Sequence, residues 1–113
     1  MTEQQTTTYE RFESSTLLAQ LMVKGEPFLE FLRRNSMSAG IYVLDAGADD
    51  LQQPHDQDEL YYVIEGQAVL EVDGDQKPVK SGSLVFVAAG VQHRFHSIAS
   101  KLSCLVVFTP AET

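Results

Sequence analysis

The sequence predicts an all-β domain, a sandwich or barrel, preceded by one short helix. Short apolar runs recur at close spacing through most of the 113 residues, and turn signals containing glycine separate them. One segment near the N-terminus has apolar residues at helical spacing instead. A chain of this length supplies one domain, which we assign to residues 9–113; residues 1–8 are polar and are expected to be disordered or frayed.

The helix is expected between a polar run and a pair of helix-breaking residues. Residues 14–16 (Ser-Ser-Thr) provide side chains that can cap the first turn. Leucines and a methionine follow between residues 17 and 22, and Gly25 and Pro27 end the pattern.

The remaining apolar runs predict seven or eight short strands. They lie at residues 28–33, 38–44, 60–64, 67–72, 77–80, 84–87, 93–96 and 102–108. Asp73-Gly74 is the strongest hairpin signal because both residues tolerate a positive φ angle, and Glu65-Gly66 indicates another turn. Cys104, the single cysteine, lies in the last apolar run and is expected to be buried.

The first predicted strand, residues 28–33, has apolar residues on both faces. A strand with this pattern is covered on both sides, as at an interface between subunits. We therefore expect a homodimer, to which the segment before Phe28 contributes.

Acidic residues dominate the charge of the chain. Asp and Glu total 16 against 8 Lys and Arg, the formal net charge is −8, and residues 45–75 contain no Lys or Arg. Nucleic acids and anionic membranes are bound by basic surfaces, so we expect neither as a partner. The N-terminus lacks the apolar stretch of a signal peptide, and no apolar run approaches the roughly 18 residues that span a bilayer. These features, with a single cysteine, favour a cytoplasmic protein.

Polar residues at even spacing mark a candidate site. Gln53, His55 and Glu59 can share one face, because residues two apart on an extended segment point the same way. His93 follows in a second segment and can face the same interior if the two segments are neighbours in a barrel. An isolated histidine on a strand is more often a hydrogen-bonded polar residue than a metal ligand, so the spacing alone leaves both interpretations open.

Two longer patterns resemble the motifs of the cupin family. The first falls on Gly47, Gln53, His55, Glu59 and Gly66, and the second falls on Gly82, Ala88, Gly90, His93 and Ser97, with the spacing of both motifs kept. The resemblance implies a small double-stranded β-helix, a jelly-roll barrel. The chain departs from the family pattern at three positions, where Gln53 replaces a histidine, Ala88 a proline and Ser97 an asparagine.

The resemblance also implies a metal site. In metal-binding cupins the ligands are two histidines and a glutamate of the first motif and the histidine of the second, and this chain keeps His55, Glu59 and His93. Gln53 could bind through its amide oxygen or hydrogen-bond a bound water or substrate. Two imidazoles and a carboxylate suit Fe(II), and also Mn²⁺, Ni²⁺ or Zn²⁺. Tyr61 shares the face of Glu59 and could orient a ligand or contact substrate, although packing in the core is the commoner role of an aromatic strand residue.

Three functions follow from this site, because the cupin barrel supports many chemistries. The first is a metal-dependent enzyme, most simply an oxygenase, acting on a small organic substrate. The second is an isomerase or lyase of a sugar or keto acid. The third is a binding or sensing module that holds a small molecule without converting it.

Overall fold

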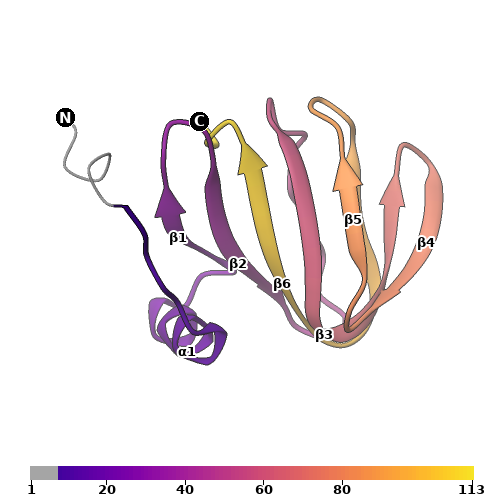
Figure 1. Ribbon diagram of the computed structural model, residues 1–113. Helices are drawn as coiled ribbons and strands as arrows, with labels where there is room; N and C mark the ends of the chain where they lie inside the picture. The colour runs from indigo at the N-terminus through magenta and orange to yellow at the C-terminus, as the bar shows by residue number, and fades with distance from the viewer. Residues whose placement is uncertain (1–7) are drawn as a thin grey trace.

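The structure, a computed structural model, describes residues 8–113 and is mostly β (Figure 1). Its elements follow in this order: α1 (Ser14–Lys24), β1 (Phe28–Arg33), β2 (Ser38–Leu44), β3 (Asp58–Val72), β4 (Asp75–Lys80), β5 (Leu84–Val87) and β6 (His93–Thr109). The predicted disorder of residues 1–8 falls almost wholly outside the described residues; Thr8 is exposed and lies in neither a helix nor a strand. Within residues 8–113, no helix has the length and apolar character needed to cross a membrane.

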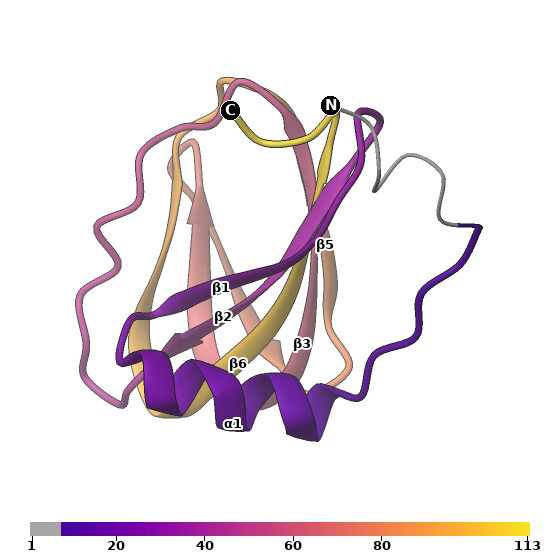
Figure 2. The same ribbon diagram turned by 90° about the vertical axis from the view of Figure 1, so that its left-hand side faces the viewer.

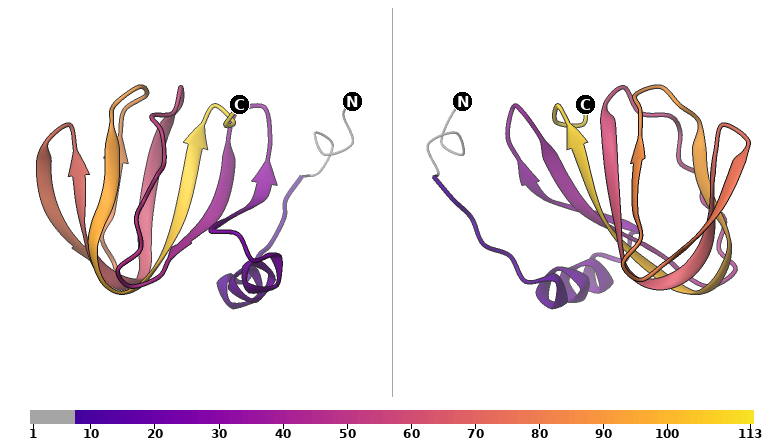
Figure 3. Two further views of the ribbon diagram at one scale, coloured as in Figure 1. Left: turned by 180° about the vertical axis from the view of Figure 1, so that it is seen from behind. Right: turned by 45° about the vertical axis from the view of Figure 1, so that its right-hand side comes forward.

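The strands form an antiparallel ladder that folds over into two facing sheets. The N-terminal half of β3 pairs with β5 and with the C-terminal half of β6. The C-terminal half of β3 pairs with β4 and with the N-terminal half of β6. Figures 1 and 3 show the result, a barrel whose strands meet at one end and spread apart toward the other. This is the predicted all-β jelly-roll architecture.

One predicted turn and one predicted break between strands are bends within long strands, so residues 8–113 form six strands. The turn expected at Glu65-Gly66 lies inside β3, and the break expected after His96 lies inside β6. Gly66 has φ 100° and Ser97 has φ 51°. The register of the β3–β6 pair shifts in the same region, between Val63 and Val69 of β3. A positive φ at one residue makes a bulge that bends a strand without reversing it, and this is why the prediction of separate strands was wrong. The hairpin predicted at Asp73-Gly74 is confirmed, with positive φ at both residues.

The helix α1 lies across the outer face of β1 and β2 (Figure 2). Leu17 and Leu21 are buried against Ile41 of β2. The helix ends as predicted, with Gly25 in the left-handed region at the C-cap. The predicted N-terminal cap was wrong: Glu13 occupies that position and makes no capping hydrogen bond with its side chain. Packing of the apolar face therefore holds the first turn in place of a side-chain cap.

The two apolar faces of β1 are partly covered within one chain, and its apolar side chains are half-buried. Leu29 and Phe31 pack with α1, whereas Phe28 packs against the barrel core. The irregular alternation of this strand therefore has an intramolecular cause. The homodimer stays a prediction, and this pattern no longer supports it.

The main core fills the space between the two sheets. Tyr61, Val63, Phe95 and Cys104 are among its most buried members. Cys104 is buried, as expected, and burial raises the pKa of its thiol to about 12. A neutral, inaccessible thiol behaves as a small apolar residue.

Candidate metal centre

Three of the four predicted ligands converge in the barrel. His55 lies in the segment before β3, Glu59 near the start of β3 and His93 at the start of β6. One potential ligand atom from each lies within 4.8 Å of the other two. Glu59 and His93 are buried, and His55 is half-buried. The fold of the long strands β3 and β6 therefore gathers residues that are nearly forty positions apart in the chain.

The ring of His93 has one defined orientation. Its Nδ1 lies 2.9 Å from the carbonyl oxygen of Val91, which can only accept, so Nδ1 carries the proton and donates it. Its Nε2 lies 2.7 Å from Oε1 of Glu59. Burial lowers the pKa of His93, but hydrogen bonds to Glu59 and Val91 together with nearby negative charge raise it more, so the net shift is upward.

The carboxylate of Glu59 carries an unsatisfied atom. Its Oε2 is buried and has no hydrogen-bond partner among the described residues. A buried carboxylate oxygen in that state is unfavourable unless a cation or donor meets it. Two imidazole nitrogens and a carboxylate oxygen are ligands that Fe(II), Mn²⁺, Ni²⁺ and Zn²⁺ accept. The residues present therefore fit a divalent metal ion.

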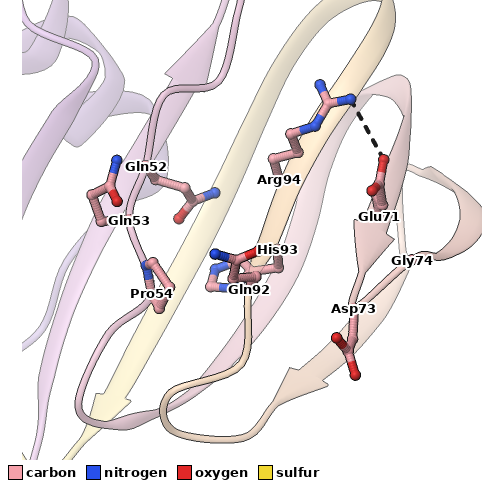
Figure 4. A pocket seen from close by; sticks show the side chains of 9 residues that line it. All are labelled: Gln52, Gln53, Pro54, Glu71, Asp73, Gly74, Gln92, His93 and Arg94. Atoms are coloured by element: carbon pink, nitrogen blue, oxygen red, sulfur yellow. Dashed lines mark hydrogen bonds and ion pairs between the residues drawn. The ribbon is translucent and has the colours of Figure 1, made fainter.

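The two glutamines before His55 are placed differently. Figure 4 shows their side chains leaving the loop on opposite sides, with Gln52 turned toward His93. Gln53 is exposed, whereas Gln52 is half-buried and accepts a hydrogen bond from the hydroxyl of Tyr61 at 3.0 Å. The loop is not an extended strand here, so the even spacing did not identify which amide reaches the barrel. A ligand role for Gln53 stays a prediction.

Tyr61 is both a core residue and a neighbour of the candidate site. It is 1% exposed and packs edge-on against Phe95. Its hydroxyl lies 3.1 Å from Nε2 of His93. Burial, and next the charge of Glu59, raise the pKa of Tyr61 well above its usual value, so the phenol stays protonated. The hydroxyl is therefore a neutral hydrogen-bonding group beside the imidazole.

A buried carboxylate that the sequence analysis did not single out holds the loop before β3. Asp50 is buried and accepts hydrogen bonds from the hydroxyl of Tyr42, from the side chain of Gln52 at 2.6 Å and from the backbone of Phe95 at 2.8 Å. Burial first, and then the bond to Asp50, raise the pKa of Tyr42. Asp50 thereby joins the loop to β2 and β6 and sets the position of Gln52.

Replacing Asp50 with alanine is expected to lower the free energy of unfolding by about 3 kcal/mol, because it leaves buried donors on Tyr42 and Phe95 without an acceptor. Urea denaturation of the purified variant measures this loss. Asp49→Ala, at the exposed neighbouring position, is the control and should change stability by less than about 0.5 kcal/mol. Equal effects of the two substitutions would contradict the structural role of Asp50.

Two cavities meet at this site. One of about 170 Å³ is mostly apolar and lies inside the barrel; its lining includes Phe28, Tyr42, Gln52, His55, Glu59, Tyr61, Val106, Phe108 and Glu112. The other, of about 300 Å³, is polar and is lined by Gln52, Gln53, Pro54, Glu71, Asp73, Gly74, Gln92, His93 and Arg94 (Figure 4). Glu59 and His55 line the first cavity and His93 lines the second, so a molecule in the first cavity could approach two of the three candidate ligands.

Arg94 and His96 stand apart from the candidate ligands, as their odd offsets from His93 predict. Arg94 is exposed and forms an ion pair with Glu71 (Figure 4), with 3.5 Å between the guanidinium and the carboxylate. His96 lies 3.0 Å from the side-chain oxygen of Gln76. Both residues lie on β6, and their side chains contact residues of the neighbouring strands β3 and β4.

The sequence model of the family described as "Cupin domain" matches residues 40–109. The chain belongs to the cupin family. This cupin is 45% identical over 102 residues to the uncharacterized protein SCO3923 of Streptomyces coelicolor, and the alignment covers 90% of this chain and 97% of the relative.

Solved cupin structures share the fold. An RmlC-like cupin from Shewanella frigidimarina is 25% identical, with a TM-score of 0.66, over 74% of this chain and 75% of that one. An RmlC-like cupin with a double-stranded β-helix from Methanocaldococcus jannaschii is 21% identical, with a TM-score of 0.67, over 74% and 78% of the two chains. KdgF from Halomonas is 18% identical, with a TM-score of 0.67, over 74% and 76%. The predicted cupin barrel is confirmed.

Proposed function

We propose that this cupin binds a divalent metal ion through His55, Glu59 and His93 and is an oxygenase of a small organic substrate. Two observations carry the proposal: the Oε2 atom of Glu59 is buried without a partner among the described residues, and Glu59 belongs to a group of three residues with ligand atoms close together. A site evolved only for stability would satisfy this oxygen or replace the residue with an apolar one. The unsatisfied oxygen is better explained as a ligand.

The ligand set favours oxygen chemistry. Fe(II) held by two histidines and a carboxylate leaves coordination positions for O₂ and for a chelating substrate. The chain itself orients His93 through Val91 and keeps a neutral hydroxyl, Tyr61, beside it. The proton of that hydroxyl is donated to Gln52, so its oxygen could accept a hydrogen bond from a donor group of a molecule bound at the site.

The cavity limits the substrate to a small molecule. Phe28, Val106 and Phe108 provide apolar lining, whereas His55 and Glu59 are among the polar residues that line the cavity. A substrate with two neighbouring oxygen atoms and a compact apolar portion matches this division. The acidic charge of the chain disfavours a strongly anionic substrate.

A non-redox reaction is the second candidate, and one observation favours it. The buried pair of Glu59 and His93, with Tyr61 3.1 Å from the imidazole, could move a proton between neighbouring carbon atoms of a sugar or keto acid. Such chemistry would use Glu59 as a base instead of a ligand.

Metal titration followed by oxygen uptake tests these proposals. We expect the purified protein to bind Fe(II) and to consume O₂ only when a small substrate with two neighbouring oxygens is present. Substrate conversion without O₂ uptake would favour the isomerase or lyase, and ligand binding without conversion would favour a sensing module. A protein that takes up none of Fe(II), Mn²⁺, Ni²⁺ and Zn²⁺ would contradict the metal-dependent function.

A further inference from the structure

The C-terminal tail crosses the open end of the barrel (Figure 2). It runs from the end of β6 toward the segment before β3, where the side chain of Gln57 donates to the hydroxyl of Thr113 at 3.2 Å. The backbone N–H of Glu112 donates to the buried Ser38 at 2.9 Å, and its carbonyl accepts from Arg33 at 2.7 Å. Both backbone groups of Glu112 are therefore held by β1 and β2.

This attachment delivers the Glu112 carboxylate to a candidate metal ligand. Oε2 of Glu112 lies 2.8 Å from Nδ1 of His55, and both side chains are largely shielded from solvent, at 25% and 21% exposed. A carboxylate accepts, so Nδ1 of His55 carries a proton, and in the neutral form of the ring Nε2 has the lone pair. His93 also donates from its Nδ1, to the carbonyl oxygen of Val91, whereas its Nε2 faces the Glu59 carboxylate at 2.7 Å.

We propose that Glu112 is a positioning residue of the metal centre: by accepting from Nδ1 of His55 it fixes the ring and tautomer that present Nε2 to the metal. The inference rests on the proposed metal-binding function. Metal-bound histidines commonly donate their other N–H to a carboxylate, which orients the ring and strengthens it as a ligand. The cluster of ligand atoms within 4.8 Å comprises His55, Glu59 and His93 among the described residues, so Glu112 acts through His55 and not as a ligand.

The Glu112 carboxylate also suits a metal site that has fewer histidine ligands than the family motif. Gln53 stands where the family motif has a histidine, so this chain has one imidazole fewer than the full set. A carboxylate that accepts from Nδ1 makes the imidazole of His55 a stronger metal ligand than a backbone carbonyl would. The C-terminal residues are thereby part of the functional unit, although they lie outside the matched region of the cupin family, residues 40–109.

Calorimetric titration of the full chain with Ni²⁺ tests the inference. Glu112→Ala is expected to weaken Ni²⁺ binding by about 10- to 100-fold. Glu112→Gln keeps an acceptor oxygen without the charge and should recover part of that loss. Asp56→Ala removes an exposed carboxylate next to His55 in the chain, and this matched control should change the affinity by less than about threefold.

Ring ¹⁵N NMR of the metal-free protein separates positioning from general stability. In the wild type we expect neutral His55 in the Nδ1–H form, and in Glu112→Ala a shift toward the Nε2–H form, with the melting temperature nearly unchanged. Three results for Glu112→Ala would each overturn the inference. They are an unaltered Ni²⁺ affinity, an unaltered tautomer of His55, and the loss of one oxygen ligand from the X-ray absorption spectrum of bound nickel. In those cases wild-type binding would still support the proposed function; a wild type that binds no metal would end both.

Discussion

Replacing Glu59 with glutamine is expected to abolish metal-dependent stabilisation while leaving the metal-free protein about as stable as the wild type. The substitution removes the charge that a divalent ion needs but keeps the size of the side chain and an acceptor oxygen for His93. It also removes a carboxylate whose Oε2 is buried without a partner. These opposing changes should alter the free energy of unfolding of the metal-free protein by no more than about 1 kcal/mol.

Thermal unfolding with and without metal measures both parts of this prediction. Metal at about 100 times its Kd should stabilise the wild type by about 2.7 kcal/mol, which raises the melting temperature of a domain of this size by about 10 °C. Glu59→Gln should show almost none of this increase. If the variant is stabilised by metal as strongly as the wild type, Glu59 is not a ligand.

His93→Ala provides a contrast to Glu59→Gln. It should also eliminate the metal response, but it leaves the Glu59 carboxylate buried without its 2.7 Å partner. Removing one member of a buried charged pair lowers stability by about 3–5 kcal/mol. His96→Ala is the matched control, because His96 bonds to Gln76 on the β3–β4 sheet and should not affect the metal response.

The sequence was sufficient to predict the candidate ligands but not their supporting residues. His55, Glu59 and His93 could be identified because two motifs keep a defined spacing along the chain. Glu112 could not, because its contact with His55 depends on how the tail crosses the barrel. Asp50 could not for the same reason: its partners lie on β2, β6 and the loop that it holds.

The strand pattern was predicted well wherever alternation and turn residues agree. The hairpin at Asp73-Gly74 combines two residues that tolerate positive φ with flanking strands that pair directly. Gly66 and Ser97 also have positive φ angles, but there the chain bends and continues in the same strand instead of reversing. Whether a glycine reverses a chain or bends it depends on the neighbouring strand, and that information is tertiary.

The bend at Gly66 is also what allows the candidate ligands to meet. Glu59 precedes it in β3, and His93 pairs with the part of β3 that follows it. Gly66 itself contacts β6 closely: a Cβ there would overlap the carbonyl oxygen of Lys101 and lie 2.7 Å from the Cα of Leu102. Both obstacles are backbone atoms of a paired strand, which cannot move aside without breaking the ladder.

Gly66→Ala is therefore expected to lower the free energy of unfolding by about 3 kcal/mol or more, from a strained φ of 100° and the overlap with β6 together. Gly74→Ala is the matched control, because Gly74 also has a positive φ, 86°, but open space around its Cα, and should lose only about 1 kcal/mol. Urea denaturation of both variants measures the difference, which isolates the close approach from the backbone angle. Equal losses would mean that β6 yields to a methyl group at this bend. A larger loss at Gly66 would show that the close approach of β6 constrains the bend in addition to the backbone angle.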